Sequence, residues 1–192
     1  MNTLENVREA LPAWARDQRL NLDAVLAEGG ALSPTDRWGV AVAVAAARPT
    51  VPLLAALVAE ARLKMGAAAE PAIEDGLAAA SLMAMNNVFY RFRHMIGKPV
   101  YSEKPARLRM NRLAKPATTK AGFELMALAV SAVNGCEACV KAHETVVLEG
   151  GLSEDHVHEA VRIAAVVQAV ATALESSRAV PAPVAEPALA PA

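Results

Sequence analysis

Apolar residues recur along most of this chain at the three- and four-residue spacing of amphipathic helices. Leu4, Val7 and Leu11 show this spacing near the N-terminus. Period-two alternation of β-branched residues, which is typical of strands, is not sustained over the length of a strand outside the Ala/Val runs. The pattern therefore predicts an all-α protein without a β-sheet.

Helix-start and helix-stop signals give the bounds of the predicted helices. Ser33 precedes a proline and an acidic residue, as is typical of a helix N-terminus, and Asn134-Gly135 is a stop signal. We expect helices over residues 4–26 with a break near Pro12, then 34–47, 51–65, 70–95, 105–113, 118 or 119 to 133, 136–148 and 157–174.

The length and composition are those of one globular domain, with 192 residues of which 54% are hydrophobic and 20% charged. We expect this helical domain to occupy residues 1–177. Residues 178–192 contain four prolines among small residues, which predicts a disordered tail. Residues 83–88 and 130–136 are each an apolar helix ending in Asn-Asn or Asn-Gly, which suggests two similar helical halves.

The net charge of -1 gives no electrostatic case for binding to nucleic acid or to an anionic membrane. We interpret the basic stretch from Lys98 to Arg112 as a solvated face. The longest clean apolar run, residues 39–47, is far shorter than the roughly 20 residues that span a bilayer. The N-terminus has no apolar core of signal-peptide type, so the expected location is the cytoplasm.

Both cysteines lie in the motif Cys136-x-x-Cys139-x-x-x-His143. In a reducing compartment such a pair is typically catalytic, redox-active or metal-binding. Residues four apart share a helix face, so the ring of His143 is expected over the sulfur of Cys139. We therefore predict Cys139 as the nucleophile and Cys136 as the thiol that resolves its product in an intramolecular disulfide. At the very start of its helix, Cys136 is also expected to be the more accessible thiol.

Three polar residues interrupt predicted apolar helices and need partners if they are buried. Asn86 and Asn87 either bend their helix or form hydrogen bonds in the core, and the bend is the favoured interpretation. Glu124 precedes the cysteine motif and is able to return to it after the turn, where it would orient His143. Spacing alone favours a surface position for this glutamate.

Two alternatives to redox chemistry stay open from the residues themselves. Zinc needs four ligands, of which Cys136, Cys139 and His143 would be three, although a single Cys-x-x-Cys pair is a weak zinc signal. A non-catalytic interaction protein, with zinc or without a ligand, would use the cysteines for assembly. Candidates for the fourth ligand are His156, His158 and Glu124.

The chain resembles the alkyl hydroperoxide reductase D family of the carboxymuconolactone decarboxylase-like superfamily in three stretches. These are residues 85–91 (Met-Asn-Asn-Val-Phe-Tyr-Arg), 123–125 (Phe-Glu-Leu) and 130–143, which contain the cysteine motif. The resemblance extends from about Leu4 to Leu174. It implies a homotrimeric antioxidant enzyme, a lipoyl-dependent peroxiredoxin, that reduces organic hydroperoxides weakly itself. It also implies a partner peroxiredoxin, alkyl hydroperoxide reductase C, which the protein would regenerate.

The electrons in that family come from NADH through dihydrolipoamide dehydrogenase and a lipoyl-bearing acyltransferase. The resemblance thus implies dihydrolipoamide as the donor, with no bound cofactor or metal. By motif, Cys139 matches the cysteine that forms sulfenic acid, Cys136 the proton donor and mixed-disulfide thiol, and Glu124 and His143 the proton relay. Ala138 departs from the pattern, because relatives often carry a histidine there. The decarboxylases of the superfamily are a second interpretation, against which the two cysteines argue.

Overall fold

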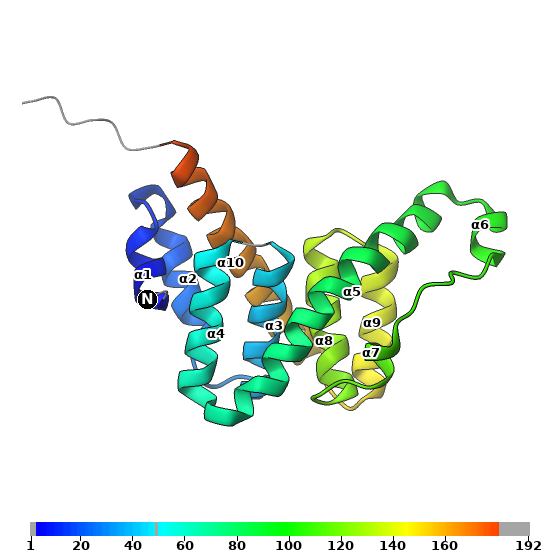
Figure 1. Ribbon diagram of the computed structural model, residues 1–192, viewed down its shortest axis with the longest axis horizontal. Coiled ribbons are helices and arrows are strands. Elements are labelled where there is room, and N and C mark those ends of the chain that lie inside the picture. Colours follow the sequence, from blue (N-terminus) through cyan, green and yellow to red (C-terminus); the bar gives the residue numbers. More distant parts are fainter. Residues whose placement is uncertain (1–2, 49, 181–192) are drawn as a thin grey trace, which may run out of the picture.

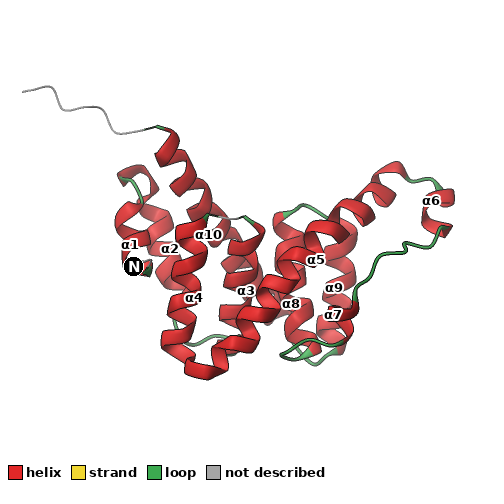
Figure 2. Ribbon diagram, in the orientation of Figure 1, coloured by secondary structure: helices red, strands yellow, loops and turns green. Residues whose placement is uncertain are grey.

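The computed structural model describes residues 3–48 and 50–180, and over these ranges the chain forms helices and connecting loops without any strand (Figures 1 and 2). The all-α prediction is confirmed. Single 3-10 turns precede α2 and α5. The α-helices are α1 (Leu4–Ala10), α2 (Arg16–Leu26), α3 (Pro34–Ala47), α4 (Val51–Met65), α5 (Ala69–Ile96), α6 (Pro99–Glu103), α7 (Asn111–Ala114), α8 (Lys120–Val133), α9 (Glu137–Glu149) and α10 (Glu154–Ala179).

Local capping explains where the main helices begin. The Ser33 hydroxyl accepts a hydrogen bond from the Asp36 amide at 3.1 Å, with proline in the first turn of α3. The Thr119 hydroxyl does the same for the Gly122 amide at 3.0 Å and starts α8. Thr50 occupies the N-cap position of α4, but its side chain makes no capping hydrogen bond.

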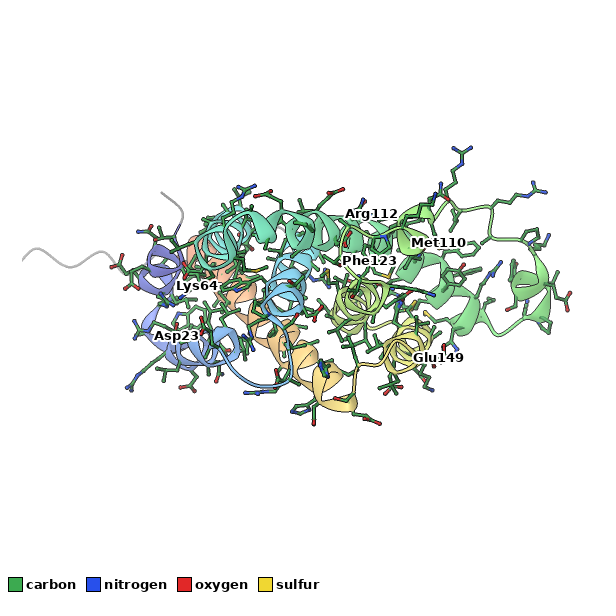
Figure 3. All side chains as sticks on the ribbon, turned by 90° about the horizontal axis from the view of Figure 1, so that it is seen from below. Asp23, Lys64, Met110, Arg112, Phe123 and Glu149 are labelled. Carbon is green, nitrogen blue, oxygen red and sulfur yellow. A yellow bond between two sulfur atoms is a disulfide. The ribbon has the colours of Figure 1, made fainter. Side chains whose placement is uncertain are left out.

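The core is built around α3 and α8, whose sequences are apolar on nearly every face. Residues 40–45 of α3 and 121–131 of α8 are buried, and Phe123 lies in the interior of the bundle (Figure 3). Helix α3 packs against α4, α5, α8 and α10, so it is covered on several sides. Gly76 of α5 lies against the backbone of α3, which allows these two helices to approach closely.

The C-terminal end of α5 projects beyond the bundle and turns back through α6 (Figure 1). We call residues 91–115, which include this end, α6 and α7, the arm. The helix predicted over 105–113 is present only at its end, as α7, because residues 105–110 have no regular structure. Lys104, before a proline, is extended, and Arg107 has a φ of 52°. Tethers at the two ends hold the segment instead: Arg93 donates to the Lys104 carbonyl, and Arg112 pairs with Asp75.

Helix α10 continues to Ala179, beyond the predicted end at Leu174 and past the expected domain boundary. The remainder of the predicted tail, 181–192, lies outside the described residues. Among the described helices, α10 alone has the length and apolarity of a membrane span. It packs against α2, α3 and α8, as the core helix of a bundle does.

Candidate active site

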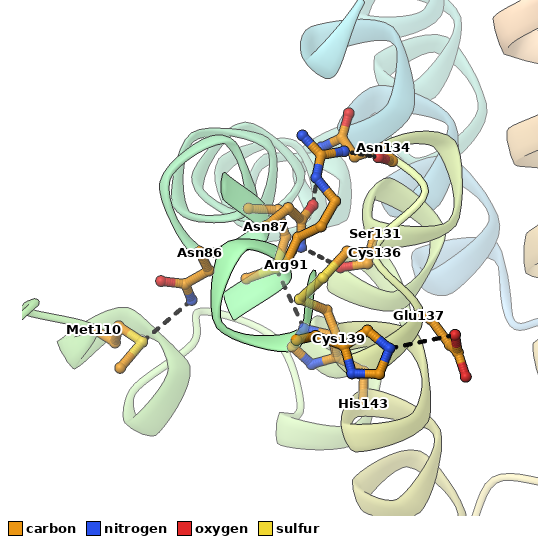
Figure 4. Close-up of a disulfide and its surroundings, with 12 residues drawn as sticks. Asn86, Asn87, Arg91, Met110, Ser131, Asn134, Cys136, Glu137, Cys139 and His143 are labelled. Carbon is orange, nitrogen blue, oxygen red and sulfur yellow. Dashed lines mark hydrogen bonds and ion pairs between the residues drawn. A yellow bond between two sulfur atoms is a disulfide. The ribbon is translucent and has the colours of Figure 1, made fainter. Parts of the chain in front are cut away.

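The turn between α8 and α9 places the two cysteines. Gly135 has a φ of 66° and ends α8, and the Cys136 amide then donates to the Ser131 carbonyl at 3.0 Å. Cys136 is the N-cap residue of α9, and Cys139 lies in its first turn. The two sulfurs form a disulfide, with the Cα atoms 5.3 Å apart (Figure 4). The intramolecular disulfide predicted from the spacing is therefore present.

A chain of hydrogen bonds ties this turn to α5 (Figure 4). The Asn87 amide nitrogen donates to the Ser131 hydroxyl at 2.9 Å, and its amide oxygen accepts from Asn134 at 2.9 Å. Arg91, one turn further along α5, donates to the Asn134 carbonyl at 2.6 Å. The core hydrogen-bonding role is therefore confirmed for Asn87. Helix α5 is continuous through this position, so Asn87 does not cap a break in the helix.

Glu124 and His143 meet beneath the cysteines. Glu124 is only 7% exposed, and its Oε2 lies 2.5 Å from Nδ1 of His143, so the surface position favoured by spacing is wrong. The other ring nitrogen, Nε2, lies 3.2 Å from the thioether sulfur of Met83. Since a thioether has no proton to donate, a hydrogen bond there requires a proton on Nε2. The contact with Glu124 fixes the orientation of the ring at its Nδ1 edge.

An apolar pocket of about 220 Å³ opens onto this site. Cys139 is 7% exposed and lines the pocket, whereas Cys136 is 0% exposed. The prediction that Cys136 is the more accessible thiol is therefore wrong. The reason is tertiary packing. The turn that Asn87 and Arg91 bind lies under α5, so Cys136 is covered although it lies at the start of α9. The pocket is lined by Asn86, Tyr90, Met110, Leu113, Ala138, Cys139, Ala142 and His143.

The outer wall of the pocket comes from the arm, through Met110 and Leu113. The Asn86 amide nitrogen lies 3.1 Å from the Met110 sulfur (Figure 4). A second anchor is Asp75, whose fully buried carboxylate accepts hydrogen bonds from Arg112 and from the backbone amides of 117 and 118. Burial alone would raise the pKa of Asp75, but these hydrogen bonds outweigh it and hold the pKa below its ordinary value. This anchor was not predicted from the sequence, in which an acidic residue within an apolar helix was the available signal.

The described ranges contain no set of side chains that would serve as zinc ligands. No group of three or more His, Cys, Asp or Glu side chains there is arranged to hold a metal ion. His156 instead forms the cap of α10, with its Nδ1 2.9 Å from the Ser153 hydroxyl. His158 is exposed on the same helix.

Comparison with known proteins decides the family. Residues 99–182 match the Carboxymuconolactone decarboxylase family. A protein called alkyl hydroperoxide reductase AhpD from Anaeromyxobacter dehalogenans strain 2CP-C is 66% identical over 176 residues, covering 91% of this chain and 92% of that protein. This chain belongs to the AhpD family. Proteins of the same name from Bradyrhizobium sp. strain BTAi1 and Rhodospirillum centenum are 48% and 44% identical, over 91% and 92% of this chain and 94% and 93% of their own lengths.

AhpD membership confirms the resemblance drawn from the Asn-Asn-Val-Phe-Tyr stretch and the cysteine motif. The structure brings all four candidate residues together: the disulfide joins Cys136 to Cys139, and the contact between Glu124 and His143 lies on the same side of α9. Their catalytic roles stay predictions.

Proposed function

We propose that this protein is an antioxidant oxidoreductase, a lipoyl-dependent peroxiredoxin that reduces organic hydroperoxides and regenerates a partner peroxiredoxin of the alkyl hydroperoxide reductase C type. One observation carries the proposal: the Cys136–Cys139 disulfide, with Cys139 facing an apolar pocket beside a buried Glu124–His143 pair. The name shared by the relatives that are 44–66% identical supports the same activity.

In the proposed reaction, the Cys139 thiolate attacks the terminal oxygen of the hydroperoxide. The S–O bond forms as the O–O bond breaks, and the departing alkoxide takes a proton from His143 and leaves as the alcohol. Cys139 is then a sulfenic acid. The Cys136 sulfur attacks it, and the disulfide forms with release of water. Two thiols of dihydrolipoamide reduce that disulfide and become lipoamide, supplying two electrons and two protons.

The proton relay is proposed to consist of Glu124 and His143. Ala138 has no proton to transfer, so a relay through the position between the cysteines is absent from this chain. The 2.5 Å contact with Glu124 fixes the ring at Nδ1, and the Met83 sulfur lies against its Nε2 edge, which supports this role. His143 follows Cys139 by one helical turn (Figure 4), and this spacing supports its proposed role as the proton donor to the leaving oxygen.

The pocket favours hydroperoxides with an apolar organic group. Its wall is formed by carbon-rich side chains such as Leu113, Met110 and Ala142. Exchange with the partner peroxiredoxin through Cys136 would require the turn at Asn134 to open, because Cys136 is fully covered. We propose that this opening accompanies docking of the partner.

We further propose that the protein works in the cytoplasm as a homotrimer, without a bound cofactor, and receives electrons from NADH through dihydrolipoamide dehydrogenase and a lipoyl-bearing acyltransferase. Support for self-association comes from large apolar side chains exposed on the last turns of α5 and on α6. They are Val88, Phe92, Met95, Ile96, Val100 and Tyr101.

The test is NADH consumption in the presence of dihydrolipoamide dehydrogenase, lipoamide and cumene hydroperoxide, comparing the protein with its Cys139→Ser variant. We expect one NADH to be oxidised per hydroperoxide, with the rate abolished in the variant and increased by added peroxiredoxin. Absence of turnover from folded protein with both thiols reduced, in both settings, would contradict the proposal.

A further inference from the structure

Of the described residues that line the apolar pocket, one has a buried polar atom without a hydrogen-bond partner. Asn86 of α5 is 4% exposed, and its amide oxygen is buried and unpaired among the described residues. The next residue, Asn87, is also buried, but it uses its amide nitrogen and oxygen in contacts with Ser131 and Asn134. A buried acceptor without a donor lowers stability, because its hydration is lost and nothing replaces it. Packing of the fold therefore does not explain Asn86.

The contact with Met110 decides which end of the Asn86 amide is unpaired. The amide nitrogen lies 3.1 Å from the Met110 sulfur (Figure 4). A thioether accepts a hydrogen bond but has no proton to donate, so the nitrogen is assigned to this position. The opposite assignment would place two acceptors against each other. The unpaired atom is thus an acceptor, and a ligand that pairs with it needs an N–H or O–H group.

Asn86 lines the same pocket as Cys139 and His143. Both ring nitrogens of His143 already have contacts, Nδ1 with Glu124 and Nε2 with the Met83 sulfur. The rest of the lining consists largely of carbon-rich side chains. The pocket therefore combines an apolar wall with a buried acceptor close to the reactive cysteine.

The Asn86 oxygen becomes reachable when the amide turns about its Cβ–Cγ bond. In the disulfide form the oxygen is covered, so a ligand does not touch it without that turn. The contact that holds the amide is weak, since a thioether sulfur is a poor acceptor. A ligand with an O–H group exchanges this N–H···S contact for a stronger O–H···O hydrogen bond, so ligand binding favours the turn.

The chemistry of a hydroperoxide matches this acceptor. A hydroperoxide has one O–H group, on its terminal oxygen, beside an organic group that an apolar wall accommodates. A dialkyl peroxide has the same O–O bond but no hydrogen to donate. Its binding would leave the Asn86 oxygen unpaired, and sites built to pair a hydroxyl reject analogues that lack it for this reason.

We propose that Asn86 is a substrate-binding residue that accepts a hydrogen bond from the terminal O–H of the hydroperoxide and restricts the enzyme to peroxides with that group. The role rests on the proposed function for its chemistry. Asn86 holds the oxygen that the Cys139 thiolate attacks, and the departing alkoxide takes its proton from His143. Asn86 transfers no proton, because the hydrogen stays on the attacked oxygen and becomes that of the sulfenic acid.

The test uses two unreactive ligands that differ in the hydroxyl. In neophyl alcohol a CH₂ group replaces the inner oxygen of cumene hydroperoxide, and in tert-pentylbenzene a methyl group also replaces the terminal hydroxyl. Ligand-observed NMR with the reduced protein gives both dissociation constants without any need for turnover. We expect the unmodified protein to bind the alcohol more tightly, although an apolar pocket by itself would prefer the hydrocarbon. Asn86→Leu should lower the ratio of the two affinities at least about tenfold.

Tyr90→Phe is the matched control, because it removes the hydroxyl of another lining side chain, one that is only partly buried. Its affinity ratio should agree with that of the unmodified protein within about twofold. In the NADH-coupled assay, Asn86→Leu should lower kcat/KM for cumene hydroperoxide about tenfold.

Two further measurements separate substrate binding from a structural role of Asn86. Methyl methanethiolsulfonate has no hydrogen-bond donor, so in a Cys136→Ser background its rate of reaction with Cys139 should change less than about twofold on Asn86→Leu. The urea midpoint of Asn86→Leu should be unchanged or higher, because replacement of an unpaired buried acceptor by an apolar group does not destabilise the fold.

Several outcomes would overturn the role of Asn86. Tighter binding of the hydrocarbon by the unmodified protein, or an unchanged ratio in Asn86→Leu, would show that this oxygen does not receive the hydroxyl. A lower ratio in Tyr90→Phe alone would assign the acceptor to Tyr90. A lower urea midpoint together with slower modification of Cys139 would make Asn86 a structural residue. Absence of turnover by the unmodified protein, with the affinity ratios as expected, would instead overturn the proposed function and leave the acceptor in place.

Discussion

Replacement of Asp75 by Asn tests the anchor that holds the pocket wall in place. Asp75 is fully buried in α5, and its two oxygens have different partners. Oδ1 accepts from Arg112 at 2.9 Å and from the Ala117 amide at 3.0 Å, and Oδ2 accepts from the Thr118 amide and hydroxyl, both at 2.7 Å. The Asn side chain keeps one oxygen, so its amino group must face donors on the other side.

The expected loss of stability follows from these contacts. An amino group in place of Oδ2 leaves the Thr118 amide without an acceptor, which costs about 1–3 kcal/mol. Loss of the negative charge also weakens the pair with Arg112. That term is smaller than the roughly 3–5 kcal/mol of a fully buried pair, because Arg112 is 28% exposed and also contacts Glu74. We expect Asp75→Asn to lower the free energy of unfolding by about 2–4 kcal/mol in total.

Urea unfolding of the disulfide form measures this loss, with Glu74→Gln as the matched control. Glu74 also pairs with Arg112 but is 64% exposed, so its replacement should cost less than about 1 kcal/mol. Equal costs for the two variants, or no cost for Asp75→Asn, would refute the reasoning.

The pH dependence has a defined sign. The folded pKa of Asp75 lies below its unfolded value of about 3.9. Its carboxylate therefore stabilises the fold above about pH 4, and this contribution is lost as the pH falls through the folded pKa. The stability difference between the unmodified protein and Asp75→Asn should thus be full near neutral pH and shrink below about pH 4. A difference that grows on acidification would contradict the assigned role.

Three further variants test other parts of the structure. Glu124→Gln should lower kcat/KM for cumene hydroperoxide about 10- to 100-fold, the worth of one charge-assisted hydrogen bond, and a steady-state assay that shows no loss would remove Glu124 from the relay. Leu113→Gln should raise KM for cumene hydroperoxide about fivefold and leave that for hydrogen peroxide unchanged, since only the organic group meets the pocket wall. Gly76→Ala should cost about 1–3 kcal/mol in urea unfolding, because an added Cβ would lie 2.9 Å from the Gly39 carbonyl oxygen of α3.

Local sequence signals were sufficient to predict most of the helices. The caps at Ser33 and Thr119 and the stop at Gly135 depend on side chains within a few residues, so the bounds of α3, α8 and the start of α9 could be read from the sequence. The segment 105–113 could not, because its conformation depends on distant tethers. Arg93 and Asp75, both on α5, override its local helix propensity.

The candidate site likewise combines features that the sequence predicts with features that depend on tertiary packing. The disulfide and the expected position of His143 near Cys139 follow from spacing along one helix. The burial of Cys136 and the contact of Glu124 with His143 depend on how α5, α8 and α9 pack together, which spacing does not encode. The basic stretch from Lys98 to Arg112 was interpreted as a solvated face, and its relation to the cysteines appears only when the arm is seen beside the pocket.

The most direct test of the account is to trap the oxidised nucleophile. The Cys136→Ser variant, reduced and then given one equivalent of cumene hydroperoxide with dimedone, should release one equivalent of alcohol per subunit and carry the dimedone adduct on Cys139, as read by peptide mass spectrometry. In the matched Cys139→Ser variant, Cys136 should stay unmodified under the same conditions. An adduct on Cys136 in that variant, with none on Cys139 in the first, would contradict the assignment of Cys139 as the nucleophile.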